Sequence, residues 1–132
     1  MVSTAKKIDL FANIPQSDFL GFSKNGEIRS KKVIEFLELN KNDVSVATGV
    51  PVSSIRYDKD RISKELKERI QEIANICQLV AQFFKGDAHK TAQWFWLPNP
   101  ACGEISPRDL IRFGRYKKLL KMVHRSLQGE LP

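Results

Sequence analysis

The sequence predicts an all-α protein in which two small helical units are joined by one long helix. Residues 62–84 carry apolar side chains at alternating spacings of four and three, the pattern of a long amphipathic helix. Shorter segments on either side begin at serine, asparagine or proline and end at glycine, as helices do. A proline-rich break at residues 97–100 divides the last third of the chain into further short helices.

Length and composition limit the possible classes of protein. The 132 residues suffice for one domain or two small ones, with 42% hydrophobic and 28% charged residues. The chain has no apolar run of bilayer length and its start is too polar for a signal peptide, so we expect a cytoplasmic protein without membrane contact. Cys77 and Cys102 form neither a metal-ligand spacing nor a disulfide framework. We find no nucleophile motif or phosphate loop and therefore expect no enzyme activity, cofactor or metal.

The net charge of +7 is concentrated toward the C-terminus, most densely in residues 108–125. A basic protein favours an anionic partner, which is either nucleic acid or an acidic protein surface. The charge alone does not choose between these two partners.

Residues 1–29 are expected to form an arm with one short helix or strand. Phe11, Phe19 and Phe22 provide apolar surface that docks this arm onto the body. A helix is predicted over residues 30–39. Asn40 then caps a second helix that ends at Gly49, with Asp43 completing a capping box.

A third helix is predicted to begin after Val50-Pro51 and to run through Tyr57, which gives residues 42–56 the layout of a helix-turn-helix. The second helix of that motif lies in the DNA major groove, while nearby basic side chains contact phosphates. The candidate DNA-binding residues are Lys41, Ser53, Ser54, Arg56, Tyr57 and Lys59. An ordinary helical hairpin with a solvated face is the alternative. This half is only weakly basic, so specific DNA binding would require a homodimer.

The long helix at 62–84 has a seam of Leu66, Ile70, Ile73, Cys77 and Val80, widened by a second apolar stripe. A face this broad is normally covered by the helix's own domain. We therefore expect a spine within the chain, with dimerisation through part of the seam as the lesser alternative.

Residues 91–114 combine consecutive aromatics with a rigid elbow. Neighbouring side chains on a helix diverge by roughly 100°, so Trp94, Phe95 and Trp96 cannot share one face, and at least one of them is expected to point away from the core. The prolines end this helix, and Ser106-Pro107 begins the next one. Two short helices held by a proline elbow are typical of a docking site.

The last predicted helix, at residues 115–128, is amphipathic, with an apolar face that includes Tyr116 and Leu127 and a basic face that includes Lys118 and Lys121. Such a face binds a membrane, nucleic acid or a protein partner, and most often is merely solvated.

The order of these elements, and above all the segment AQWFWLPNPACGEISP, resembles the Xre/MbcA/ParS antitoxins of bacterial type II toxin–antitoxin pairs. The toxin-binding domain of that family has a tryptophan-containing helix, then a pattern of proline, asparagine, glycine, proline, leucine and late glycines. The matching positions here are Trp94 or Trp96, Pro98, Asn99, Gly103, Pro107, Leu110, Gly114 and Gly129. The family often has a second glycine where Glu104 stands, and aliphatic residues in place of Phe95 and Cys102.

The resemblance implies four parts: an arm at 1–29, an Xre-like helix-turn-helix at 30–62, a connecting helix at 63–86 and a toxin-binding domain at 87–132. It implies a cognate toxin as partner, either a RES-type enzyme that consumes NAD or an ADP-ribosyl-transferring toxin, and operator DNA as a second partner. The expected toxin contacts are Trp94, Trp96, Pro98, Asn99, Arg112, Arg115, Lys118 and Lys121. A standalone repressor and a scaffold or localisation adaptor are the alternatives.

Overall fold

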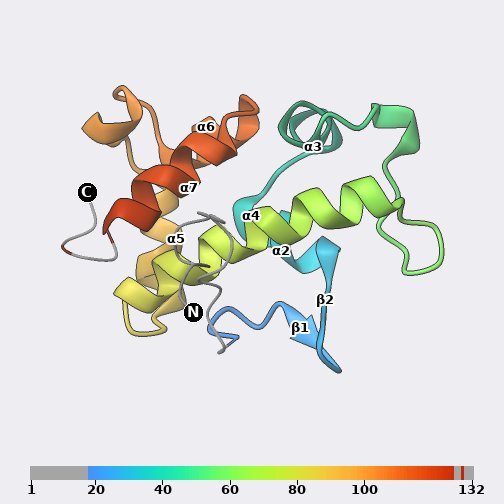
Figure 1. Ribbon diagram of the computed structural model, residues 1–132, viewed down its shortest axis with the longest axis horizontal. Coiled ribbons are helices and arrows are strands. Elements are labelled where there is room, and N and C mark those ends of the chain that lie inside the picture. Colours follow the sequence, from blue (N-terminus) through green and yellow to red (C-terminus); the bar gives the residue numbers. More distant parts are fainter. Residues whose placement is uncertain (1–17, 127–128, 130–132) are drawn as a thin grey trace, which may run out of the picture.

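The computed structural model describes residues 18–126 and residue 129, and this part of the chain is mainly helical (Figure 1). The helices are α2 (Ser30–Leu37), α3 (Lys41–Thr48), α4 (Lys64–Phe83), α5 (Ala88–Trp96), α6 (Pro107–Arg112) and α7 (Tyr116–Arg125). Two-residue strands β1 (Ser23–Lys24) and β2 (Glu27–Ile28) form an antiparallel hairpin. Two 3-10 turns complete the described elements, η1 (Val52–Ser54) and η2 (Pro100–Cys102). The predicted all-α class is confirmed.

The α4 helix is the spine of the fold. The Ser63 side chain accepts a hydrogen bond from the Leu66 N–H and starts the helix, which is about 30 Å long. From Ile73 to Ala81 every side chain is buried. The other helices of this chain therefore enclose the second half of α4, and its a/d seam is covered within the chain.

The two predicted helical units share one hydrophobic core. Buried side chains from Phe22 through Val123 form a single cluster, and α3 packs on α6 while α7 packs on α4. The Tyr116 hydroxyl donates to the Glu72 carboxylate, which ties α7 to α4. Burial and the neighbouring Glu72 raise the pKa of Tyr116, so the hydroxyl remains a donor.

The described end of the arm docks on α4. Phe22 is buried, and the Asp18 carboxylate accepts hydrogen bonds from the Phe22 and Ser23 N–H groups and from Gln78 on α4. Burial acts to raise the pKa of Asp18, but these hydrogen bonds outweigh it and lower that pKa. The predicted contact of Phe11, and that of Leu127 at the other end, lie outside the described residues.

Helix starts agree closely with the sequence. Asn40 and Asp43 form the predicted capping box, and Ser106 accepts from the Asp109 N–H at the start of α6. The α2 helix ends at Leu37, before the predicted end at Leu39. Glu38 adopts a left-handed conformation there (φ 52°), and the Leu39 N–H returns to the Ile34 carbonyl, which closes the helix.

The predicted third helix through Tyr57 is wrong: only the single 3-10 turn η1 forms there. Val, Ile and Ser are poor helix formers, and Ile55 adopts an extended conformation that buries its side chain completely in the core. Because the buried Ile55 is extended, the helical conformation ends after the three residues of η1. The motif is a helix, a glycine turn and a short turn, without a second α-helix.

Candidate partner-binding surface

The three consecutive aromatics of α5 point in different directions, as predicted. Asp87 caps the helix, and Phe95 is fully buried. Trp94 is half-buried and packs edge-on against Phe95, with 5.1 Å between ring centroids. Trp96 is 42% exposed. Of the two tryptophans, Trp96 is thus the one that presents a large face to solvent.

Arg108 holds Trp96 in place. The guanidinium carbon lies 4.0 Å from the centroid of the Trp96 ring, a cation–π contact worth about 0.5–2 kcal/mol. The same side chain donates to the Leu37 and Glu38 carbonyls at 2.5 and 2.7 Å. Those carbonyls lie at the C-terminal end of α2, where unpaired oxygens favour a cation. One arginine therefore joins the aromatic helix, α6 and α2.

Phe113 and Val46 form the second apolar exposure, at 54% and 59%. The two side chains belong to segments that meet closely: a Cβ built on Gly114 would lie 3.0 Å from the Val46 carbonyl oxygen. Gly114 also has φ +80°, which favours glycine. The α6–α7 turn can approach α3 only because residue 114 lacks a side chain.

Charged contacts connect the two apolar ends. Arg108 approaches the Asp109 carboxylate at 4.0 Å, and Asp109 accepts a hydrogen bond from Arg112 at 2.7 Å. The Arg112 guanidinium lies 5.7 Å from the Phe113 ring centroid. Trp96, Arg108, Asp109, Arg112 and Phe113 thus follow one another by direct contact along α6. We call these five residues with Val46 the α6 strip.

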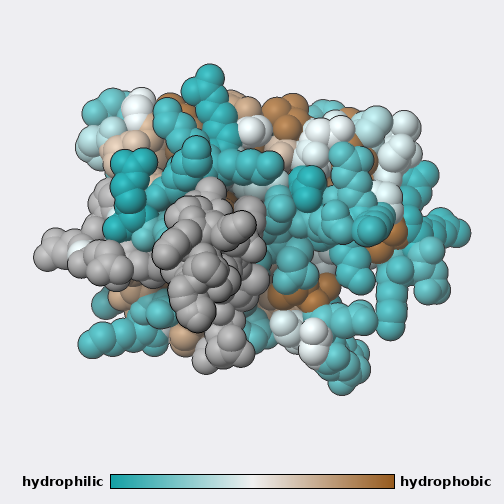
Figure 2. Space-filling view, in the orientation of Figure 1, coloured by the Kyte–Doolittle hydropathy of each residue, from teal (hydrophilic) through white to brown (hydrophobic). Residues whose placement is uncertain are grey.

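In Figure 2, hydrophobic side chains reach the surface along the upper edge, over the region where α6 and α3 lie in Figure 1. Hydrophilic side chains cover most of the remaining described surface on this face. A large exposed apolar patch with a polar border is a usual feature of a protein interaction site.

The elbow between α5 and α6 is organised by Asn99. Its side chain accepts from the Ala101 N–H at 2.9 Å, and its backbone bridges to Ile105. Asn99 is only 7% exposed and shapes the loop, and its predicted contact with a toxin stays a prediction. Pro98 and its neighbour Leu97 (61% exposed) do face solvent.

Arg112 lies in the α6 strip, as a predicted toxin contact, and is also bound within the chain. Its guanidinium binds the Asp43 and Asp109 carboxylates at 3.1 and 2.7 Å, and these hydrogen bonds raise its pKa. Its charge is therefore used within the chain, between α6 and α3. The other predicted basic contacts, Arg115, Lys118 and Lys121, are exposed at the start and on the outer face of α7.

The predicted DNA-binding residues lie on and around η1. Ser53, Ser54, Arg56, Lys59 and Lys41 are exposed, and Tyr57 is half-buried. The Arg56 guanidinium donates to the Ser53 and Ile55 carbonyls, which are in its own turn. No α-helix is present here to enter a major groove, so these side chains are displayed by a turn and the loop that follows it.

Sequence reasoning missed four members of the strip: Phe113, Val46, Arg108 and Asp109. A helical wheel contains a signal for the first, because Phe113 lies roughly 110° from the middle of the Leu110 and Ile111 face. The places of Val46 and Arg108 depend on contacts between distant segments, and that of Asp109 on its ion pairs with Arg108 and Arg112.

The described residues offer neither a metal-binding cluster nor an activated thiol. No group of three His, Cys, Asp or Glu residues there is placed to hold a metal ion. Burial raises the pKa of the Cys102 thiol, with the charge of Lys118 opposing it, so this cysteine is a poor nucleophile. None of the helices in the described part combines the length and apolar character needed to cross a membrane. The chain matches no family model, and no curated protein matches it.

Proposed function

We propose that this chain is a cytoplasmic antitoxin that binds a cognate toxin through the α6 strip and the adjoining elbow. The toxin would be a RES-type enzyme that consumes NAD or an ADP-ribosyl-transferring enzyme, inhibited because this chain covers its active site. The observation that carries the proposal is the exposed Trp96, held by Arg108 at the start of the strip. It lies in the segment that resembles the toxin-binding domain of Xre/MbcA/ParS antitoxins.

The geometry of the strip supports protein binding. Interface hot spots are enriched in Trp and Arg, and large side chains that are already ordered lose less conformational entropy on binding. Trp96 is fixed by Arg108, and Phe113 lies beside Arg112, which two carboxylates hold. The strip therefore offers two ordered aromatic anchors, one at each end of α6.

The basic face of α7 supplies electrostatic complementarity. Arg115, Lys118 and Lys121 are exposed, and the whole chain carries a net charge of +7. A toxin pocket that cleaves NAD contains catalytic acids, which these cations would attract. Such charges chiefly raise the association rate, and their effect declines with salt.

Regulation of its own operon is the second part of the proposal, with operator DNA as partner and a homodimer as the DNA-binding form. The exposed Ser53, Ser54 and Arg56 on η1 support it. With a turn in place of the second helix, base contacts would come from the turn and phosphate contacts from Lys41 and Lys59. We expect so short an element to recognise a specific DNA sequence only weakly.

The test is co-expression of this chain with the product of the neighbouring gene, followed by affinity purification and a growth assay. Wild-type chain should form a stable complex and restore growth. Trp96→Ala should lower the affinity about 30-fold, the effect of losing a hot spot of about 2 kcal/mol. The variant should stay folded and lose only about 0.5–2 kcal/mol of unfolding free energy, the worth of the cation–π contact with Arg108.

Trp94→Ala is the matched control, since it removes the same side chain from a half-buried position two residues earlier on the same helix. This variant should lose stability and lose binding only in proportion to its unfolded fraction. If Trp96→Ala and Phe113→Ala both bind and neutralise like the wild type, the α6 strip is not the interface.

A further inference from the structure

The outer side of α7 carries a row of cations and no acid. Lys117, Lys118, Lys121 and Arg125 are all exposed, and they lie within an arc of about 100° opposite the buried side of the helix. We call these four residues the α7 row. Residues 115–125 contain five bases and no acid, so this short segment accounts for +5 of the net charge of +7.

The described part of the chain does not neutralise the row. None of the four residues forms an ion pair there, whereas Arg69, Arg108 and Arg112 on α4 and α6 each approach a carboxylate.

The row also works against the helix that carries it. Lys117 and Arg125 each stand four residues from Lys121, and like charges at this spacing repel one another. The α7 helix begins without a side-chain cap or an acid in its first turn, so the cations at its start oppose the helix dipole as well. These placements destabilise α7 in the free chain, and an anion lying along the row would relieve the repulsion.

The kind of anion follows from what the outer side of α7 lacks. The large apolar side chains exposed among the described residues all belong to other segments, and those of α7 are buried, its tyrosine included. Protein interfaces depend on desolvated anchors, and helices at membrane surfaces insert an apolar face. Single-stranded nucleic acid needs an exposed aromatic ring on which its bases stack. Contacts with the phosphates of a duplex require only cations and hydrogen-bond donors.

The length of the row suits a duplex. From Lys117 to Arg125 the helix rises about 12 Å. Over that distance a DNA duplex presents roughly seven phosphates, more than enough for four cations. Hydrophilic side chains cover most of the surface in Figure 2 where α7 lies in Figure 1.

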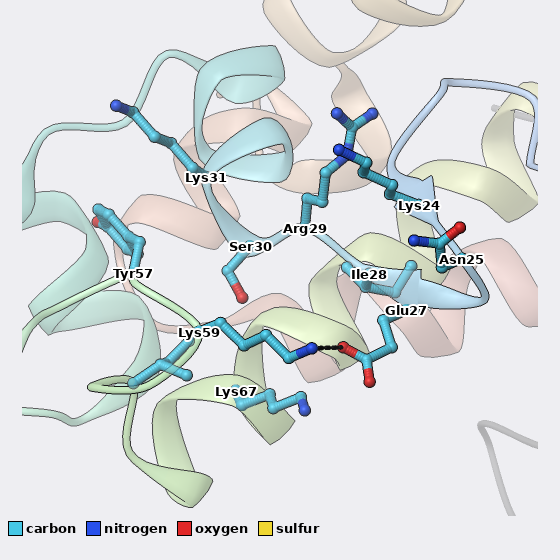
Figure 3. A pocket seen from close by; sticks show the side chains of 11 residues that line it. Lys24, Asn25, Glu27, Ile28, Arg29, Ser30, Lys31, Tyr57, Lys59 and Lys67 are labelled. Atoms are coloured by element: carbon cyan, nitrogen blue, oxygen red, sulfur yellow. Dashed lines mark ion pairs between the residues drawn. The ribbon is translucent and has the colours of Figure 1, made fainter.

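A second group of cations differs from the row in both respects. It lines a cavity of about 440 Å³ beside the hairpin (Figure 3). There Lys31 points away from Lys59, and Lys59 lies 4.0 Å from the Glu27 carboxylate. These cations do not form a single row and have an acid among them, so they provide a control for the row.

We propose that the α7 row binds the phosphate backbone of a nucleic-acid duplex, independently of base sequence. This activity goes beyond the antitoxin function and does not use η1. The loop that contains η1 lies at the right of Figure 1, between α3 and the start of α4, whereas α7 runs toward the left. Lys118 and Lys121 are also among the charges proposed to attract the toxin, so a duplex and the toxin would compete for them.

The experiment measures the fluorescence anisotropy of a random-sequence DNA duplex of about 20 base pairs with the full-length chain, between about 50 and 200 mM salt. The logarithm of the association constant should fall with the logarithm of salt concentration with a slope of about −3.6, the value for four phosphates. Poly-glutamate is the probe for an acidic protein, and it should bind at least tenfold more weakly than the duplex. Equal binding of the two polymers would overturn the assignment to a duplex.

Paired substitutions distinguish the row from general attraction. Lys117→Gln with Lys121→Gln should lower the duplex affinity at low salt at least tenfold and reduce the slope to about −1.8. The melting temperature should not fall, because the change removes repulsion within α7. Lys31→Gln with Lys67→Gln, an equal loss of charge at the cavity, should alter the affinity less than threefold.

Equal losses for the two pairs, or no duplex binding at the lowest salt, would overturn the proposal. The assay contains neither a toxin nor an operator sequence, so such a failure would leave the antitoxin proposal standing. Failure of the toxin to bind would likewise leave the duplex affinity of the row unchanged.

Discussion

The α6 strip and η1 are both exposed, but the chain holds them very differently. Trp96 and Phe113 at the ends of the strip contact arginines, and those arginines bind carbonyls or carboxylates of α2 and α3. On η1, the side chains of Ser53 and Ser54 are exposed, and the turn is anchored by the buried Ile55 that follows it. Contacts with distant segments therefore hold the α6 strip, whereas η1 is held by its neighbours in sequence.

This difference bears on the two partners of the proposal. A braced surface loses little entropy on binding and can present its anchors with fixed spacing. A three-residue turn offers few side chains and no helix for the major groove. We therefore expect protein binding to be the stronger activity of this chain and DNA binding to be mostly electrostatic, with a steep dependence on salt.

Disrupting the close contact between Gly114 and Val46 should cause the largest loss of stability. Gly114→Ala forces a left-handed conformation on alanine, at about 1 kcal/mol, and places its Cβ 3.0 Å from the Val46 carbonyl oxygen. We expect about 3 kcal/mol of lost unfolding free energy in all, measured by urea denaturation. The separation of α3 from α6 should also abolish toxin binding.

Gly103→Ala is the matched control for that variant. Gly103 has φ +81°, close to the +80° of Gly114, but its added Cβ would meet no atom within 4 Å. Gly103→Ala should therefore lose only the free energy of forcing alanine into a left-handed conformation, about 1 kcal/mol. If the two variants lose the same stability, the close approach of Gly114 to Val46 is unimportant and the bracing at this end of the strip is weaker than described.

Arg108→Ala tests the other end of the strip. It removes hydrogen bonds to the Leu37 and Glu38 carbonyls as well as the Trp96 stacking, so we expect a loss of about 2 kcal/mol in unfolding free energy. Arg108→Lys should recover only part of it, because an ammonium lacks the planar fork. Trp96 fluorescence should change in both variants. Arg115→Ala, an equal loss of charge at an exposed position, should cost little.

Local signals predicted most of the helical framework. The Asn40 and Asp43 box, the Ser106-Pro107 start and the apolar spacing of α4 depend on neighbouring residues, and the structure confirms all three. The division of three adjacent aromatics among different directions also follows from helix geometry alone. These features need no knowledge of the rest of the chain.

Local sequence patterns fail where contacts between distant segments determine the conformation or the partners of a residue. Burial of Ile55 replaced the expected helix through Tyr57 with η1, although the pattern there fits a helix. The intrachain contacts of Asn99 and Arg112 were also not foreseen: Asn99 shapes the elbow, and Arg112 binds two acids of its own chain. Arg108 reaches carbonyls 70 and 71 residues away, a pairing that sequence spacing does not reveal.

Arg56→Ala should give the smallest change in stability and the sharpest separation of the two regions. Arg56 donates only to the Ser53 and Ile55 carbonyls of its own turn, and its side chain is exposed, so we expect about 0.5 kcal/mol or less. If η1 contacts DNA, the affinity for a duplex from upstream of this gene should fall several-fold, with a reduced salt slope if the contact is to phosphate. Toxin binding should be unchanged, because Arg56 does not belong to the strip. Equal losses of DNA and toxin binding would mean that η1 supports the strip structurally, and the contrast between the two regions would fail.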